Sequence, residues 1–150
     1  ETRGEKTLIV FYLSAYGNTR HMAEALVAGA ESIAGVRVSL YDLEGSQASI
    51  FTDLVEEADG LAFGSPTING DAVRPIWALL SSLTSVNVKG KLGAAFGSYG
   101  WSGEAVGMLE ERLKSLKTRL VEPGVRAILV PTADDLEHCR ELGQRVAAAL

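Results

Sequence analysis

Hydrophobic and polar positions along this 150-residue chain follow two kinds of pattern in turn. Residues 7–13 form an unbroken apolar run rich in β-formers, which is typical of a central strand covered on both faces. Beyond that strand, small and apolar residues recur at the spacing of one helix face: Met22, Leu26, Gly29 and Ile33. Residues 36–41 then alternate apolar and polar side chains, which predicts a half-covered strand at a sheet edge.

The same scheme continues along the rest of the chain. The expected elements are helices over 50–58, 72–83, 102–117 and from Thr132 onwards, and strands over 60–65, 91–98 and 120–130. Pro123 and Gly124 interrupt the last strand, and Thr132 with two acids in the following turn is typical of a helix start. Five strand–helix units in a row predict an α/β fold, a parallel sheet with helices on both faces.

Helical spacing also separates buried from exposed positions. The inward set in the helices over 72–83 and 102–117 is Ile76, Leu79, Leu80, Leu83, Val106, Leu109, Leu113 and Leu116. Residues 110–112, Glu-Glu-Arg, are expected to form a solvated helix face. Cys139 lies on the same side of the last helix as Leu142 and Val146, so we expect a small core residue there.

Length and composition limit the class of protein. A chain with 47% hydrophobic and 22% charged residues is typical of one compact domain at this length. No apolar run reaches the roughly 18 residues of a membrane-spanning helix, so no membrane partner is expected. A single cysteine favours a reducing, cytoplasmic setting. The net charge of −5 argues against nucleic acid and requires any anionic ligand to be held by local backbone groups.

Candidate chemistry gathers in three loops. In a doubly wound sheet, ligands bind beyond the carboxyl ends of the strands, where the strand order reverses. The loops that follow the first, third and fourth strands cover residues 14–19, 65–71 and 98–103, and all three are rich in glycine and hydroxyl groups. The first loop runs directly into a helix, whose unpaired N–H groups favour a phosphate. The alternative is an ordinary capped turn that binds nothing.

The third loop adds an aromatic signal. Tyr99 and Trp101 flank Gly100, and two large aromatic side chains at a ligand-side loop favour a flat partner. The alternative is that both rings pack on the neighbouring helix. A phosphate site beside an aromatic surface indicates a mononucleotide that carries a planar ring. The second loop is then expected to close the other side of that ring.

Other chemistries find little support in the residues. The first and third strands do not end in the acids that a phosphoacceptor domain needs. Dinucleotide-binding, triphosphate-binding and hydrolase motifs are absent from the sequence. With two histidines and one cysteine, metal ligation lacks ligands. We therefore assign no catalytic and no metal-binding residue.

At these loops the sequence resembles the flavodoxin family, over nearly the whole chain. The likeness is greater to the flavodoxin-like domain of flavodiiron proteins, also called A-type or diflavin flavoproteins, through residues 64–70 and 94–104. The resemblance implies a three-layer sandwich with strand order 2-1-3-4-5 and a non-covalently bound FMN. The cofactor-binding residues that it implies are Ser14, Tyr16, Gly17, Asn18, Thr19, Pro66, Thr67, Ile68, Asn69, Gly70, Ser98, Tyr99, Gly100, Trp101, Ser102 and Gly103.

The resemblance also implies a function. The FMN would take electrons from a flavin reductase or another donor and pass them to a diiron centre for O2 or NO reduction. That centre belongs to an upstream metallo-β-lactamase-like domain, and its ligands are not in this sequence. Residues 1–6 are expected to be the remnant of a linker, residues 7–150 the FMN-binding domain, and a homodimer is a candidate assembly.

Three alternatives remain open from the residues. A stand-alone short-chain flavodoxin would differ only in its genetic context. An NAD(P)H-quinone reductase of flavodoxin fold would need a nicotinamide pocket over the flavin. A binding module that kept the fold and lost the cofactor would be colourless when purified.

Overall fold

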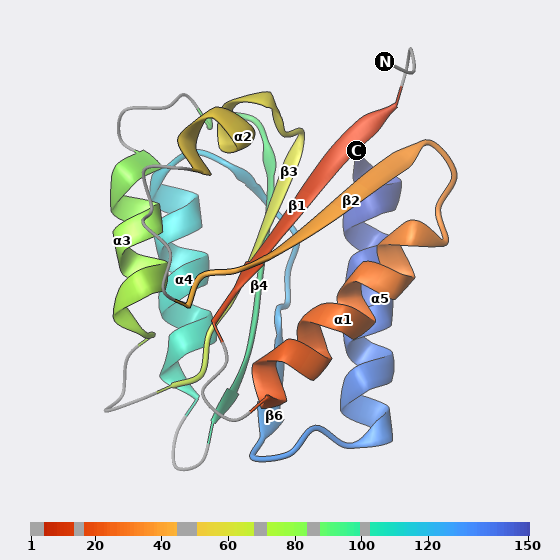
Figure 1. The fold of residues 1–150 in the computed structure, drawn as a ribbon, viewed down its shortest axis with the longest axis vertical. Coiled ribbons are helices and arrows are strands. Elements are labelled where there is room, and N and C mark those ends of the chain that lie inside the picture. The colour runs from red at the N-terminus through yellow and green to blue at the C-terminus, as the bar shows by residue number, and fades with distance from the viewer. Residues whose placement is uncertain (1–4, 14–16, 45–50, 68–71, 84–87, 100–102) are drawn as a thin grey trace.

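The chain forms a three-layer α/β domain with a parallel sheet in the middle (Figure 1). The computed structural model describes residues 5–13, 17–44, 51–67, 72–83, 88–99 and 103–150. Its elements in chain order are β1 (Lys6–Tyr12), α1 (Asn18–Glu31), β2 (Val36–Asp42), α2 (Thr52–Glu57), β3 (Gly60–Gly64), α3 (Arg74–Ser82), β4 (Leu92–Tyr99), α4 (Glu104–Ser115), β5 (Arg119–Leu120), β6 (Val125–Ile128) and α5 (Ala133–Ala149).

The strand order confirms the expected 2-1-3-4-5 arrangement. The sheet runs β2-β1-β3-β4, and β5 and β6 both pair with β4, all in parallel. The predicted fifth strand is thus split in two, as Pro123 and Gly124 indicate. Its first part pairs at Leu92↔Arg119 and its second at Phe96↔Val125. Between the two parts the chain leaves the sheet, because proline has no N–H for the ladder.

Burial follows the sequence pattern closely. The last five residues of β1 and all of β3 are buried, as expected of strands covered on both faces. Among the described strands, β2 pairs with β1 alone, and its residues are half-buried or exposed. The prediction of an edge strand over residues 36–41 is therefore confirmed.

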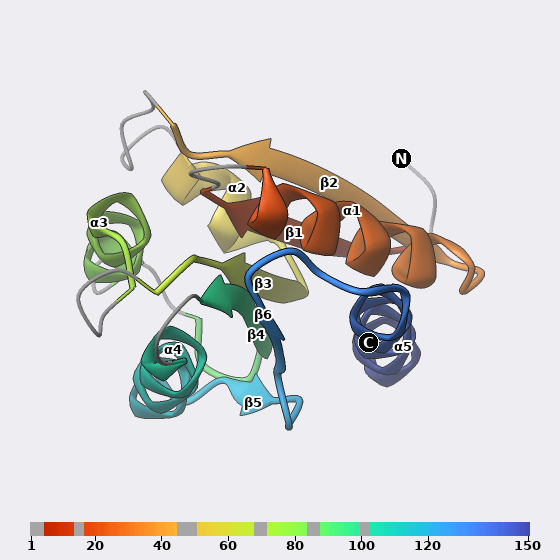
Figure 2. The same ribbon diagram turned by 90° about the horizontal axis from the view of Figure 1, so that it is seen from below.

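Two hydrophobic cores lie on the two faces of the sheet. Helices α1 and α5 cover one face, and α2, α3 and α4 cover the other (Figure 2). We call the core under α1 and α5 the first core and the core under α2, α3 and α4 the second core. In the second core the Phe11 and Phe63 rings stack with their centroids 5.6 Å apart. The first core contains Cys139, whose side chain is fully buried as predicted.

Helices α1 and α5 approach closely because both present a glycine at their contact. A Cβ atom on Gly29 would lie 2.0 Å from the Arg140 carbonyl oxygen. A Cβ on Gly143 would lie 2.0 Å from the Leu26 carbonyl oxygen. Neither position has room for any side chain, so the two backbones pack directly against each other.

Helix boundaries differ from the predictions by a few residues. Helix α1 ends at Glu31, so Ile33 lies in the following turn, where it still packs on the first core. Helix α4 ends at Ser115, and Leu116 forms its C-cap. Helix α2 begins at Thr52, and the expected start at residue 50 lies outside the described residues.

None of the described helices is long and apolar enough to cross a membrane.

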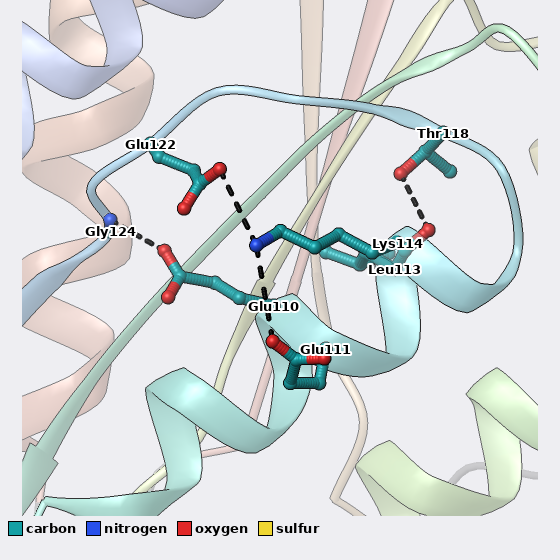
Figure 3. A network of polar contacts seen from close by, with 7 residues as sticks. All are labelled: Glu110, Glu111, Leu113, Lys114, Thr118, Glu122 and Gly124. Carbon is teal, nitrogen blue, oxygen red and sulfur yellow. Dashed lines mark hydrogen bonds and ion pairs between the residues drawn. The ribbon is translucent and has the colours of Figure 1, made fainter.

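The face of α4 expected to be solvated holds the turn between β5 and β6 (Figure 3). The Gly124 amide donates to Glu110 Oε2 over 2.8 Å, and Glu110 is half-buried. Lys114 Nζ lies 3.6 Å from the Glu122 carboxylate and 3.9 Å from that of Glu111. The expectation of a solvated face was wrong for Glu110, because the chain returns over α4 to start β6.

Candidate ligand-binding site

The described ends of the three glycine-rich loops lie at one edge of the sheet (Figure 1). The carboxyl ends of β1, β3 and β4 lie together at the edge where α1 begins and β6 ends, the lower edge in Figure 1. Strand order reverses at β1, which has β2 on one side and β3 on the other. This is the position where doubly wound sheets bind ligands.

The structure describes about half of the predicted site residues. Those it describes are Gly17, Asn18, Thr19, Pro66, Thr67, Ser98, Tyr99 and Gly103. The others lie outside the described residues: Ser14, Tyr16, Ile68, Asn69, Gly70, Gly100, Trp101 and Ser102. For all sixteen residues, binding of the cofactor stays a prediction, and for this second group the structure gives no position either.

Helix α1 begins in a way that suits an anion. Its N-cap residue is Gly17, with φ 84° and ψ −9°, so no side chain caps the first turn. That turn, described in full, carries no acidic residue. Helix α5 shows the contrast, since Thr132 and Asp135 form a complete capping box there. The positive end of α1 is therefore not neutralised by a side chain of its own.

Thr19 connects this helix start to the end of β4. Its hydroxyl lies 3.1 Å from the Ser98 hydroxyl, and the two side chains are 1% and 6% exposed. Two hydroxyls in one hydrogen bond leave one hydrogen and several lone pairs unused. The pair thus fixes the two loops relative to each other and keeps capacity for a further polar partner.

Thr67 connects the second loop to the third. Its amide donates to the Ser98 carbonyl over 2.9 Å, and its hydroxyl accepts from the Ala105 amide over 3.1 Å. The second bond satisfies an N–H in the first turn of α4, whose N-cap Gly103 supplies no side chain. Thr67 therefore positions the third loop, a role that the sequence does not reveal.

Ser65 belongs to the same network, although it was not among the predicted cofactor-binding residues. Its side chain is fully buried, donates to the Pro66 carbonyl over 2.8 Å and accepts from the Val73 amide over 3.0 Å. Its amide donates to the Phe96 carbonyl over 3.2 Å. A serine directly after a buried apolar strand was the available signal, because a buried hydroxyl needs partners.

Gly97 lets the second and third loops approach each other. A Cβ atom at this position would lie 2.1 Å from the Ser65 carbonyl oxygen. The third loop then closes at Gly103, where a Cβ would lie 3.0 Å from the Tyr99 ring. Tyr99 is half-buried, and its ring lies against the base of its own loop. That it also covers a ligand ring stays a prediction.

Tyr12 and Asp42 add a polar pair at the ends of β1 and β2. They face each other in the strand register, which brings the phenol close to the Asp42 carboxylate. Burial raises the pKa of Tyr12, and the negative charge of Asp42 raises that pKa further. Tyr12 therefore stays a neutral hydrogen-bond donor near the start of α1, and sequence reasoning did not single it out.

Comparison with known proteins decides the family. The family model described as Flavodoxin matches residues 10–143 of the chain. The chain belongs to the flavodoxin family. Its expected cofactor, FMN, and the predicted flavodoxin-like fold are thereby confirmed. The anion-favouring start of α1 fits the phosphate that FMN carries.

Within this family the chain is most like flavodiiron proteins, as the sequence indicated. It is 58% identical over 147 residues to Type A flavoprotein fprA from Rhodobacter capsulatus, covering 98% of this chain and 34% of that protein. A metal-soaked Flv1 flavodiiron core from Synechocystis superposes with TM-score 0.90 at 35% identity, covering 98% and 36%.

A third comparison matches a complete small protein. A flavodoxin from the domain Archaea superposes with TM-score 0.86 at 37% identity, covering 95% of this flavodoxin-like chain and 97% of the other. The chain nevertheless spans only about a third of the length of the Rhodobacter flavoprotein and of the Synechocystis core. Within the described residues, no group of three or more His, Cys, Asp or Glu side chains is arranged to hold a metal ion.

Proposed function

We propose that this chain is the FMN-binding electron-transfer domain of a flavodiiron-type protein. The cofactor supplies one- and two-electron redox chemistry, which no amino acid side chain provides alone. The protein's own residues hold the phosphate, orient the ring and limit access of water. The single observation that carries the proposal is the linked set of loops at the carboxyl edge, joined through Thr19, Ser98 and Thr67.

The phosphate is assigned to the start of α1. Gly17 leaves the first turn without a side-chain cap, and Thr19 is buried against Ser98 beside it. Asn18 stands half-buried at the first helical position, where an amide side chain can donate to an anion. With Ser14 and Tyr16 from the same loop, these residues are proposed to hold the phosphate.

The ring is assigned to the second and third loops. Pro66 and Thr67 are proposed to begin one wall of the ring site, and Ser98, Tyr99 and Gly103 to frame the other. Ile68, Asn69, Gly70, Gly100, Trp101 and Ser102 lie outside the described residues and are proposed to contribute to the same site. The hydrogen bonds from Thr67 to Ser98 and from Ala105 to Thr67 support this arrangement, because they hold the two walls at a fixed separation.

The relatives support a proposal for the electron path. The Synechocystis neighbour is described as a flavodiiron core, and the chain matches about a third of it. We propose that electrons arrive from a flavin reductase or another donor and leave for a diiron centre on an upstream metallo-β-lactamase-like domain. Reduction of O2 or NO would occur there. Residues 7–150 would form the FMN domain after a linker at 1–6, in a cytoplasmic protein able to form homodimers.

A second candidate is a self-contained flavodoxin electron carrier. The archaeal flavodoxin favours it, because that protein and this chain cover each other almost completely. Both functions require bound FMN and neither requires a nicotinamide site. They differ in whether the electrons pass to a covalently linked domain.

The proposal is tested on the purified chain in three steps. Visible absorption with mass identification of the released cofactor should show FMN in equimolar amount. Anaerobic addition of NADH or NADPH alone should leave the flavin oxidised, whereas a flavin reductase with its nicotinamide should bleach it. The reduced protein should then reduce a one-electron acceptor. Rapid bleaching by NAD(P)H alone would instead support a quinone reductase, and a colourless protein that binds no added FMN would refute the proposal.

A further inference from the structure

The third loop is held at both ends by β6 and the residue that follows it. The Leu129 amide donates to the Tyr99 carbonyl over 2.7 Å. Arg126 Nε donates to the Gly103 carbonyl over 3.2 Å. Residues 100–102, which lie outside the described residues, separate these two anchored points in the sequence. One anchor is a backbone bond that any residue can make, and the other depends on a single side chain.

Arg126 points to this loop because of its place in β6. It stands opposite Gly97 in the register with β4, and its neighbours Val125 and Ala127 are buried in the core under α1 and α5. Side chains alternate along a strand, so Arg126 projects to the other face, towards α4.

The start of α4 is shaped to receive this side chain. A Cβ atom on Gly103 would lie 3.4 Å from Arg126 Cδ, and one on Gly107 would lie 3.3 Å from Arg126 Nη2. Residues four apart share a helix face, so the two glycines form one bare surface along which the arginine lies. Tyr99 contacts the same position, since its ring would lie 3.0 Å from a Gly103 Cβ.

Ion pairing does not account for the placement of Arg126. Among the residues that the structure describes, it lies within ion-pair distance of no carboxylate, and its partner is a main-chain carbonyl. Its side chain is exposed, so it contributes little to the core. What it fixes is the position of Gly103, and with it the end of the loop that carries Tyr99.

We propose that Arg126 is a positioning residue for the flavin ring, acting through Gly103 at the end of the third loop. This inference rests on the proposed function, which places the ring against that loop. The phosphate is assigned to a different loop, at the start of α1. Arg126 should therefore influence the ring end of the cofactor and leave the phosphate end unchanged.

The test compares Arg126→Met with Arg145→Met. Methionine keeps much of the length of the stem and removes the donor and the charge. Arg145 is a matched control, because it is also exposed and donates to the main-chain carbonyls of Glu122 and Pro123, away from the third loop. Binding of FMN and of riboflavin, which lacks the phosphate, is measured by fluorescence quenching on the flavin-free protein. The visible circular dichroism of bound FMN is recorded for each variant.

We expect Arg126→Met to weaken FMN and riboflavin equally, by about three- to tenfold, the loss of one hydrogen bond to a charged donor. The circular dichroism of bound FMN should change, and Arg145→Met should match the wild type in both measurements. Unchanged affinity and spectrum in Arg126→Met would overturn the inference. A loss confined to FMN would also overturn it, because it would place the effect at the phosphate. A wild-type protein that binds neither flavin would refute the proposed function itself.

Discussion

The hydroxyl groups of Thr19 and Ser98 lie 3.1 Å apart in the interior, although 79 residues separate them in sequence. Thr19 stands in the first turn of α1 and Ser98 near the end of β4. Their hydrogen bond is the direct side-chain link between the loop proposed to hold the phosphate and the loop proposed to hold the ring. Its loss should therefore affect both stability and cofactor binding.

We predict that Ser98→Ala and Thr19→Val each lower the free energy of unfolding by about 1–3 kcal/mol, because each leaves one buried hydroxyl unpaired. The double variant should cost less than the sum of the two, since it leaves neither hydroxyl behind. Urea unfolding of the four proteins measures this coupling. Ser115→Ala is the control, because its exposed hydroxyl also makes one hydrogen bond and should cost little. Strict additivity of the two buried substitutions would show that the hydroxyls do not interact.

A second prediction concerns Glu110, which accepts the Gly124 amide at the turn into β6 (Figure 3). We expect Glu110→Ala to destabilise the protein by about 1–2 kcal/mol, because the half-buried amide loses a charged acceptor. Glu110→Gln keeps an oxygen at this position and should cost less. Thermal unfolding of both variants is the measurement.

Glu111→Ala is the matched control for Glu110. Its carboxylate is exposed and lies 3.9 Å from Lys114 Nζ, and exposed ion pairs contribute little. An equal loss of stability in Glu110→Ala and Glu111→Ala would show that the bond to Gly124 is unimportant.

The third prediction concerns pH. Burial raises the pKa of the Cys139 thiol to about 12, with a smaller contribution from the charge of Asp135. In the unfolded chain the thiol ionises near its ordinary value of 9.0, so the folded state binds the proton more tightly. The resulting stability is fully present below pH 9 and is lost as the pH rises towards 12, by about 1.4 kcal/mol per pH unit.

Cys139→Ala removes this titration and provides the comparison. Between pH 8 and pH 10.5 the wild type should lose more stability than the variant, whatever the absolute cost of the cavity. The folded wild type should also react slowly with a thiol reagent at pH 8, because the thiol is neutral and inaccessible. Parallel stability curves for the two proteins would contradict the prediction.

Features encoded in short stretches of sequence were predictable. The apolar run of β1, the helical spacing of α3 and the acids that follow Thr132 each depend on neighbours within one element. The interruption between β5 and β6 was also predictable, because Pro123 disrupts a strand wherever the strand lies in the sheet.

Contacts between distant residues were not predictable in the same way. Glu110 looks like one more charge on a solvated helix until the chain returns over α4 and places Gly124 beside it. Thr67 lies in a loop whose composition is typical of ligand binding, yet its hydroxyl accepts a hydrogen bond from the Ala105 amide. Such partners depend on how β3, β4 and α4 come together, and no local pattern records that arrangement.

The final prediction separates cofactor binding from backbone strain by means of two glycines. Gly17 and Gly35 have φ angles of 84° and 83°, and a Cβ at either position would meet no atom within 4 Å. Alanine at either site should therefore cost the same, about 1–2 kcal/mol of left-handed backbone strain. Gly17 is the N-cap of α1, where the phosphate is proposed to bind, whereas Gly35 precedes β2 and lies at the far end of α1. Unfolding of the flavin-free proteins should give equal losses of stability, while FMN titration should show weaker binding for Gly17→Ala alone. Equal FMN affinity in both variants would show that the start of α1 does not bind the phosphate.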